Sequence, residues 1–154
     1  MFEIMNDIIM KNISYELMKP EDYKALIKIW LKSELPYKPL GRDSYENISK
    51  QIKESSCDII FALLKNEIVG AVLVSHDGRK GWINRLAVPP KFRNNNIAIG
   101  LIEKAEEWFE GKEIHIYACL IEGFNNKSVH LFKKAGYKVF KGMKYLTKRD
   151  FPEI

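Results

Sequence analysis

One stretch of the sequence combines residue types that can hold an anion. Residues 86–101 read LAVPPKFRNNNIAIGL: an apolar run meets two prolines, an arginine and three asparagines, then a segment with helical apolar spacing. The N–H groups of such a loop and of the following helix N-terminus can surround a pyrophosphate, and the helix dipole favours negative charge there. Asn94, Asn95 and Asn96 can shape the turn because asparagine tolerates left-handed backbone. An ordinary connection with polar filler is the alternative.

Two separate motifs of the chain resemble those of the GNAT-type N-acetyltransferases. The first family pattern, V-x-P-x-[YF]-[RQ]-x-x-G-[IL]-[GA]-x-x-L, is matched by Val88, Pro90, Phe92, Arg93, Ile97, Ala98 and Leu101. The second, N-x-x-[AS]-x-x-[LF]-[YF]-x-x-x-G-[FY], is matched downstream by Asn125, Ser128, Leu131, Phe132, Gly136 and Tyr137. Both stand in the family's order, with a helix and a strand expected between them. The resemblance therefore covers residues 13–147, nearly the whole chain.

The resemblance implies an acyl-CoA cosubstrate, with acetyl-CoA as the expected donor, and it assigns cofactor contacts by position. Leu86, Ala87 and Val88 would lie on a splayed strand whose backbone bonds the pantetheine arm and the acyl carbonyl. Arg93 would open the pyrophosphate loop. The amides of that loop belong to Asn94, Asn95, Asn96, Ile97, Ala98 and Ile99. Asn125 would contact the pantetheine side, and a plain helix N-cap is its alternative role.

Three positions depart from the family pattern. Asn96 stands where glycine is usual, so we expect a positive φ there. Phe132, which we place on the cofactor side, replaces the tyrosine that serves many relatives as the general acid. Leu120 lies where some relatives carry a carboxylate or an imidazole, five residues before the motif asparagine. The usual acid and the usual base are therefore both missing.

Other residues are candidates for proton transfer. Glu122 follows the predicted central strand, Asn84 lies on the predicted cofactor strand, and Tyr117 and Tyr145 are possible acids. Each also has a structural interpretation: a solvated loop acid for Glu122 and sheet packing for the two tyrosines. A covalent route through Cys119 has weaker support, because the sequence shows no histidine partner for it.

Hydrophobic periodicity predicts an α+β fold with the element order βααβββαβαββ, which is also the family's order. We expect a mixed central sheet of about six or seven strands flanked by about four helices. Strands are predicted at 13–18, 59–64, 68–74, 82–88, 114–120, 137–140 and 143–147, and helices at 20–31, 44–53, 98–109 and 125–134. The loop of residues 34–42 covers the acceptor site in relatives, and Tyr37 is a candidate lid residue there.

Composition bounds the class of protein. The chain has 154 residues, 46% of them hydrophobic, which suits one domain and excludes disorder as the main state. We expect an N-terminal extension over residues 1–10, contributing little to the fold, and a single domain over residues 11–154. The extension is acidic, and its apolar run is too short for a signal peptide or a membrane span.

Charge and cysteine usage limit the partners. The 25 Lys and Arg exceed the 20 Asp and Glu by five, and they are scattered rather than clustered as a nucleic-acid reader requires. Cys57 and Cys119 are far apart without Cys-x-x-Cys spacing, which argues against a zinc site and indicates a reducing compartment. We therefore expect a cytoplasmic protein, with a symmetric homodimer as the general default.

The sequence thus predicts an N-acetyltransferase that moves an acetyl group from acetyl-CoA to a primary amine of a small molecule, peptide or protein by direct attack. A thioester is already activated, so positioning the amine and polarising the carbonyl supply much of the rate. The alternative is a catalytically silent CoA-binding sensor or partner-binding module.

Overall fold

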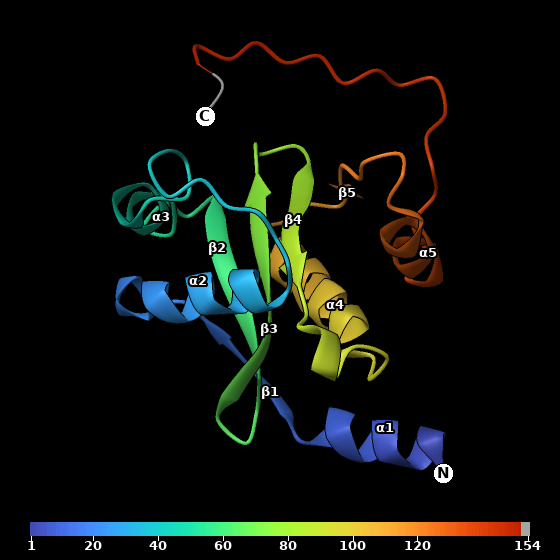
Figure 1. Ribbon diagram of the computed structural model, residues 1–154. Helices are drawn as coiled ribbons and strands as arrows, with labels where there is room; N and C mark the ends of the chain where they lie inside the picture. The colour runs from blue at the N-terminus through green and yellow to red at the C-terminus, as the bar shows by residue number, and fades with distance from the viewer. Residues whose placement is uncertain (152–154) are drawn as a thin grey trace.

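The structure is a computed structural model that describes residues 1–151 (Figure 1). Over this range the chain forms one five-stranded sheet with the spatial order β1-β2-β3-β4-β5. The strands are β1 (Ile13–Leu17), β2 (Cys57–Leu64), β3 (Glu67–His76), β4 (Gly81–Ala87) and β5 (Tyr117–Ala118). The first four are antiparallel neighbours and β5 runs parallel to β4. The predicted mixed sheet of an α+β protein is therefore confirmed.

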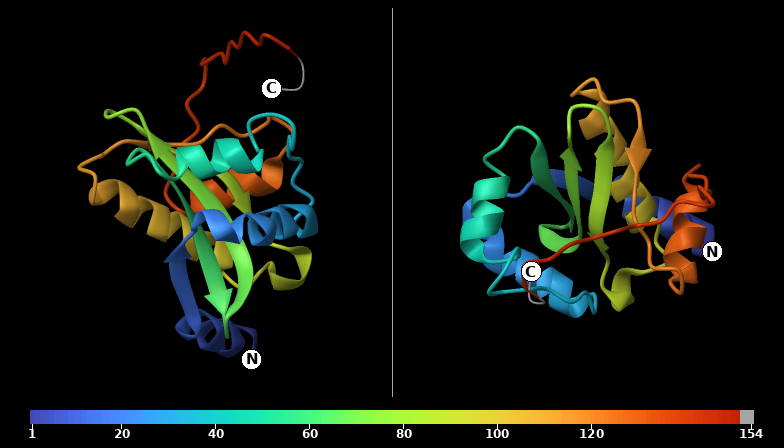
Figure 2. Two further views of the ribbon diagram at one scale, coloured as in Figure 1. Left: turned by 90° about the vertical axis from the view of Figure 1, so that its left-hand side faces the viewer. Right: turned by 90° about the horizontal axis from the view of Figure 1, so that it is seen from above.

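Helices cover both faces of the sheet, as the two views of Figure 2 show. They are α1 (Phe2–Lys11), α2 (Tyr23–Lys32), α3 (Tyr45–Gln51), α4 (Ile97–Glu110) and α5 (Asn126–Lys134), with 3-10 turns η1 (Pro20–Asp22) and η2 (Pro90–Phe92). The pair α2 and α3 packs on one face, and α4 and α5 pack on the other. Within the described range, every helix is too short or too polar to cross a bilayer.

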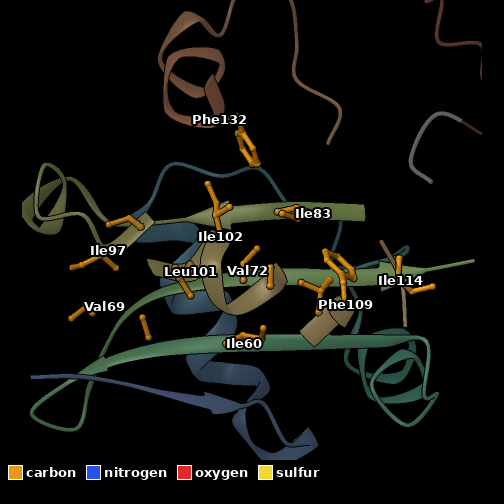
Figure 3. Packing of buried hydrophobic residues seen from close by; sticks show 14 residues of the cluster. Ile60, Val69, Val72, Ile83, Ile97, Leu101, Ile102, Phe109, Ile114 and Phe132 are labelled. Atoms are coloured by element: carbon orange, nitrogen blue, oxygen red, sulfur yellow. The ribbon is translucent and has the colours of Figure 1, made fainter. Parts of the chain in front are cut away.

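Two hydrophobic clusters sandwich the sheet. The α4 cluster consists of Ile60, Ala62, Val69, Val72, Val74, Ile83, Val88, Ile97, Leu101, Ile102, Ala105, Phe109, Ile114 and Phe132 (Figure 3). The α2/α3 cluster consists of Met18, Leu26, Ile29, Trp30, Ile48, Ile59, Phe61, Ala71 and Ala87. Successive residues of β2 enter opposite clusters because side chains alternate along a strand. This explains why β2 and β3 read as unbroken apolar runs in the sequence.

The sheet and α4 approach closely at Gly70 of β3. A Cβ atom there would lie 2.9 Å from Cδ1 of Leu101 and 3.2 Å from the carbonyl oxygen of Ala87. The missing side chain is thus what allows α4 to lie flat across β3 and β4. This contact brings the first turns of α4 close to the end of β4.

The first residues of the chain form a helix, which corrects the expectation of a frayed segment over residues 1–10. Asn12 follows α1, and its side-chain Nδ2 donates a hydrogen bond of 2.7 Å to the carbonyl oxygen of Ile8. Met10 packs against α4, since its Cε would lie 3.0 Å from a Cβ placed on Gly100. The helix forms because the segment holds no proline and its end is both capped and packed. The division into an extension and one domain stays a prediction.

The other correction concerns the C-terminal strands. The sheet of the described chain has five strands rather than six or seven, and only Tyr117–Ala118 of the predicted strand 114–120 is paired. The predicted strands 137–140 and 143–147 are not paired, and this segment runs away from the sheet as an extended trace (Figures 1 and 2). The alternating pattern is present, but a strand also needs a partner edge, and β5 offers only two paired residues.

Candidate active site

β5 pairs with only two residues of β4, and we call the β4 edge that the described chain leaves without a strand partner, from Ile83 to Ala87, the opening. The two strands pair in register only at Gly81 with Tyr117 and at Trp82 with Ala118, next to a hydrogen bond of 2.8 Å from the Gly81 N–H to the Ile116 carbonyl. Beyond these pairs β4 continues from Ile83 to Ala87 with no strand along this side in the described chain. The backbone groups of this stretch can therefore pair with an extended ligand, as an added strand would.

A β-bulge bends β4 at this opening. Leu73 pairs with Asn84 and Ala71 with Ala87, so β4 holds one residue more than β3 between these pairs. Arg85 lies in the bulge with a φ of 54°. Left-handed backbone at a residue other than glycine costs on the order of 1–3 kcal/mol and persists only where the surroundings hold it. The bulge re-aims the strand next to the opening.

The side chain of Arg85 is held by two buried partners. Its Nη2 donates to Oδ2 of Asp43 at 2.8 Å, and its guanidinium carbon lies 4.1 Å from the ring centroid of Trp30. Asp43 is 4% exposed, and its carboxylate also accepts the Lys38 N–H at 2.7 Å. Burial lowers the pKa of Arg85, and the neighbouring Asp43 opposes that shift. The pair is thus a buried ion pair, and removal of either partner would leave an uncompensated buried charge, which is strongly destabilising.

The loop before α4 has the geometry expected of an anion cradle. Asn94 and Asn96 have φ values of 64° and 59°, so the predicted positive φ at Asn96 is present. Asn96 is the N-cap of α4, and the N–H groups of its first turn have no partner within the helix. The Nδ2 of Asn95 donates to the Phe92 carbonyl at 3.3 Å and stiffens the turn. These amides and the helix dipole suit a phosphate-bearing ligand.

Arg93 braces this loop from the inside. Its Nε donates to the Val88 carbonyl at 3.0 Å, and its Nη2 donates to the Ser33 carbonyl at 3.2 Å. The guanidinium therefore ties the loop to the end of α2. The predicted role of Arg93 at a pyrophosphate loop stays a prediction, and its side chain contacts the protein.

The second motif lies on α5. Asn125 is the N-cap of this helix, and its side-chain oxygen accepts the Ser128 N–H at 3.1 Å, which is the plain capping role. Phe132 is 6% exposed and points toward Ile102 and Ile83 (Figure 3), with its ring edge-to-face on Tyr137 at 5.1 Å. Burial and Glu106 raise the pKa of Tyr137. Phe132 therefore belongs to the α4 cluster, where a buried aromatic ring anchors α5.

The four predicted proton-transfer candidates do not converge. Asn84 is half-buried and shares a face with its cross-strand partner Leu73, on the α2/α3 side. The ring of Tyr117 stacks on Phe109 at 5.2 Å, which places it on the α4 side, and burial raises its pKa. Glu122 is exposed in the loop after β5, and Tyr145 is 72% exposed in the C-terminal segment. Only Asn84 lies on the β4 side of the opening.

Cys119 is a free, half-buried thiol directly after β5. Burial raises its pKa to about 11, so it carries almost no thiolate at neutral pH. A nucleophilic cysteine needs the opposite shift. The geometry thus disfavours the covalent route that the sequence left as a weaker possibility.

The sequence reasoning missed Asp43, Arg85 and Trp30, which form the best-ordered polar cluster near the opening. Asp43 and Arg85 are 42 residues apart, so no local spacing joins them. One signal was available: an arginine within an apolar strand pattern requires a buried partner or an irregular backbone. Trp30 lies in the core with 1% exposure, and its apolar ring gives no sign in the sequence of a contact with a charged side chain.

Comparison with known proteins places this chain among acetyltransferases. It belongs to the acetyltransferase (GNAT) family, whose model matches residues 23–137. The predicted resemblance is therefore confirmed. An acetyltransferase of Sodalis glossinidius (strain morsitans) is 23% identical over 133 residues, which are 86% of this chain and 92% of that relative.

Two solved structures share the fold. AAC(6')-Iy, in complex with the bisubstrate analogue CoA-S-monomethyl-acetylneamine, has a TM-score of 0.76 at 15% identity, covering 89% of this chain and 98% of that one. PaiA N-acetyltransferase from Thermoplasma acidophilum, in complex with coenzyme A, has a TM-score of 0.74 at 19% identity, covering 83% and 91%. The predicted GNAT-like architecture is thus confirmed.

Proposed function

We propose that this protein is an acetyl-CoA-dependent N-acetyltransferase that acts on a primary amine by direct attack. One observation carries the proposal. From Ile83 to Ala87, β4 has no strand partner on its β5 edge in the described part of the chain, which then continues through η2 to the asparagine loop at the α4 N-terminus. A ligand with an extended amide-bearing arm and a pyrophosphate matches these two features in order. The CoA complexes of the two structural neighbours support the same ligand.

The backbone would supply most of the binding. Amides of residues 94–99 would hold the pyrophosphate, and the free edge of Leu86, Ala87 and Val88 would bond the pantetheine arm. The bulge at Arg85 turns the β4 backbone toward the opening, where an N–H can polarise the acetyl carbonyl. Asn125 and Phe132 would support the pantetheine side indirectly, one by capping α5 and the other by anchoring it.

The transfer step requires little from the side chains. The amine nitrogen forms a bond to the acetyl carbon while the carbon–sulfur bond breaks, and the sulfur leaves as a thiolate, which takes up the proton that the nitrogen loses as it becomes an amide. The attacking ammonium first loses a proton to solvent or to a base, for which Glu122 and Asn84 with an ordered water are the candidates. Tyr117 and Tyr145 are weaker candidates, because one is stacked on the far face and the other is remote from β4.

A silent CoA-binding module is the second candidate function. It is favoured by one observation: Phe132 is buried in the α4 cluster, so the usual proton donor has no replacement at that place. Both functions require CoA binding. They differ in whether an amine releases free thiol.

The first experiment measures thermal unfolding with acetyl-CoA, with CoA and without ligand. A ligand that binds only the folded state raises the midpoint by mass action. Release of free thiol from acetyl-CoA is then followed with neamine, spermidine and a lysine peptide. A midpoint shift with thiol release supports the enzyme, a shift without release supports the silent module, and no shift at millimolar ligand contradicts both.

A matched pair of variants tests the cradle. Asn96→Val and Glu113→Val each place a β-branched residue at a positive φ, 59° in the cradle and 58° in the turn that follows the C-terminal end of α4. Both should lose stability to a similar extent, about 1–2 kcal/mol. Only Asn96→Val should weaken CoA binding, by about ten-fold, which isothermal calorimetry measures. Equal CoA affinity in both variants would remove the asparagine loop from the site.

A further inference from the structure

The loop between α2 and α3, residues 33–44, is fastened at both of its ends. At its start, the Ser33 carbonyl accepts from Nη2 of Arg93 at 3.2 Å. Near its finish, Asp43 accepts from Nη2 of Arg85 at 2.8 Å, and the Asp43 backbone carbonyl accepts from the Tyr23 hydroxyl at 2.7 Å. The two arginines belong to one continuous segment, β4 with the loop that follows it.

Asp43 also organises the loop internally. Its carboxylate accepts the Lys38 N–H at 2.7 Å, while its own N–H donates to the Lys38 carbonyl at 3.2 Å. The Gly41 carbonyl accepts from Nδ2 of Asn47 on α3 at 2.7 Å. The 33–44 loop is therefore a braced turn rather than a loose flap, and Asp43 is the residue at which its internal and external contacts meet.

In the proposed function, the acceptor amine would arrive beside this loop. It crosses the face of the sheet that carries α2 and α3 (Figure 1), and Asp43 reaches the bulge at which β4 turns toward the opening. Asn84, the neighbour of Arg85 in the bulge, faces the same side. An amine approaching the acetyl carbonyl from this face would meet the loop on one side and β4 on the other.

We propose that Arg85 and Arg93 are positioning residues that clamp the 33–44 loop through Asp43 and Ser33, so that the strand and loop that bind the cofactor also fix the wall of the amine site. The inference rests on the proposed function, because the wall matters only where an amine binds. Two consequences follow. Filling of the asparagine loop by CoA stiffens the 33–44 loop through Arg93. Loss of the Asp43–Arg85 contact frees the loop and leaves CoA binding in place.

Hydrogen–deuterium exchange with free CoA as the probe tests the clamp without turnover. Wild type is compared with Arg85→Ala, Arg85→Lys, Asp43→Asn and Glu107→Gln. The last variant breaks the exposed Lys104–Glu107 pair on α4, which joins Nζ and Oε2 at 2.6 Å outside the site. In Arg85→Ala and Asp43→Asn, amides of the 33–44 loop should exchange about a hundred-fold faster than in wild type. Arg85→Lys should restore much of the protection, and Glu107→Gln should match wild type.

The outcomes separate the clamp from the proposed function. CoA should slow exchange of residues 94–99 in every variant, and should slow the 33–44 loop most where Arg85 and Asp43 are intact, because both ends of the loop are then held. Equal loop exchange in wild type and Arg85→Ala would overturn the clamp, even if CoA protects residues 94–99. Absence of CoA protection at 94–99 in wild type would instead overturn the proposed function, and the ligand-free comparison would still decide the clamp.

Kinetics with the amine found by the thiol-release assay adds a readout that general destabilisation does not move. Arg85→Ala should raise the KM for the amine and lower kcat, together by about a hundred-fold in kcat/KM, with the KM for acetyl-CoA unchanged. Arg85→Lys should recover part of the loss. Equal losses for both substrates would show that the cluster acts on folding alone. If Arg85→Ala does not fold, Asp43→Asn provides the same comparison.

Discussion

The four strands from β1 to β4 and the chain from β5 onward differ in how their backbone groups are paired. β2 spans 8 residues and β3 spans 10, each with a neighbour on both sides, whereas β5 has 2 residues and one neighbour. Strands β2 and β3 are buried on both faces, while the segment after α5 exposes Phe140, Met143 and Leu146. The difference indicates where a ligand site can form. The well-paired region holds β4 in place through β3, and the short pairing with β5 leaves the other edge of β4 free to bind a ligand.

The largest expected effect is a core deletion in the well-paired region. Phe109 is fully buried beneath β4, whereas Phe140 is 82% exposed. Phe109→Ala should lower the free energy of unfolding by about 3–5 kcal/mol, and Phe140→Ala should change it by less than about 0.5 kcal/mol. Urea unfolding measures both. A comparable loss in Phe140→Ala would show that the C-terminal segment packs like the core and would end the contrast.

The next-largest expected effect is a change in the free energy of unfolding with pH, caused by the buried thiol of Cys57. Burial and, to a smaller extent, Asp58 raise the pKa of Cys57 to about 11, whereas an unfolded cysteine titrates near 8.5. Between these two pKa values the Cys57 thiol keeps its proton in the folded state and loses it in the unfolded state. The contribution of the buried thiol to the free energy of unfolding is therefore complete below about pH 8.5 and is lost as the pH rises toward 11. Wild type should lose about 2–3 kcal/mol more than Cys57→Ala over this interval.

Chemical unfolding at a series of pH values measures that difference, and Cys119→Ala provides the matched variant from the second region. Burial raises the pKa of Cys119 to about 11 as well. If the chain after α4 unfolds together with strands β1 to β4, the two variants should reduce the pH dependence of the free energy of unfolding to the same extent. A flattening in Cys57→Ala alone would show that Cys119 becomes exposed before the global transition.

The smallest effect concerns helix caps. Ser44 caps α3 by accepting the Asn47 N–H at 3.2 Å, and Asn125 caps α5 by accepting the Ser128 N–H at 3.1 Å. Each change to alanine should cost about 1 kcal/mol. Ser44→Ala should lower the global unfolding midpoint, whereas Asn125→Ala should mainly increase amide exchange within α5. Identical global shifts would mean that α5 is as tightly coupled to the sheet as α3 is.

Short sequence patterns were sufficient to predict those helices and strands whose turns, caps and alternation lie within the element itself or beside it. The strands at 13–18, 59–64 and 68–74 and the helix at 98–109 were located within a few residues, since alternation, the polar turn and helical spacing are visible in short windows. The N-terminal helix α1 was not predicted, because residues 1–10 were interpreted as an extension that contributes little to the fold. The pattern of the C-terminal strands was present, but whether they pair depends on an edge elsewhere in the fold.

The candidate site divides in the same way. Backbone features were predictable, because the asparagines that adopt positive φ, Asn94 and Asn96, stand just before the helix whose N-cap is Asn96. Contacts made by side chains across the fold were not. Arg93 was expected at the ligand and instead reaches Ser33, and Asp43 was not noticed because its partner Arg85 is distant in the sequence.

The gap at Gly70 has a consequence for how this sequence can vary. Its hydrogen lies where any larger group would push against Leu101, Ile97 and the carbonyl of Ala87, that is, against the helix and the strand that border the opening. Every single-base change that replaces a glycine codon introduces a side chain. Even alanine at this position would require the Leu101 side chain to turn away and the Ala87 carbonyl to shift by a few tenths of an ångström, and any larger residue would press on the two elements that hold the anion loop.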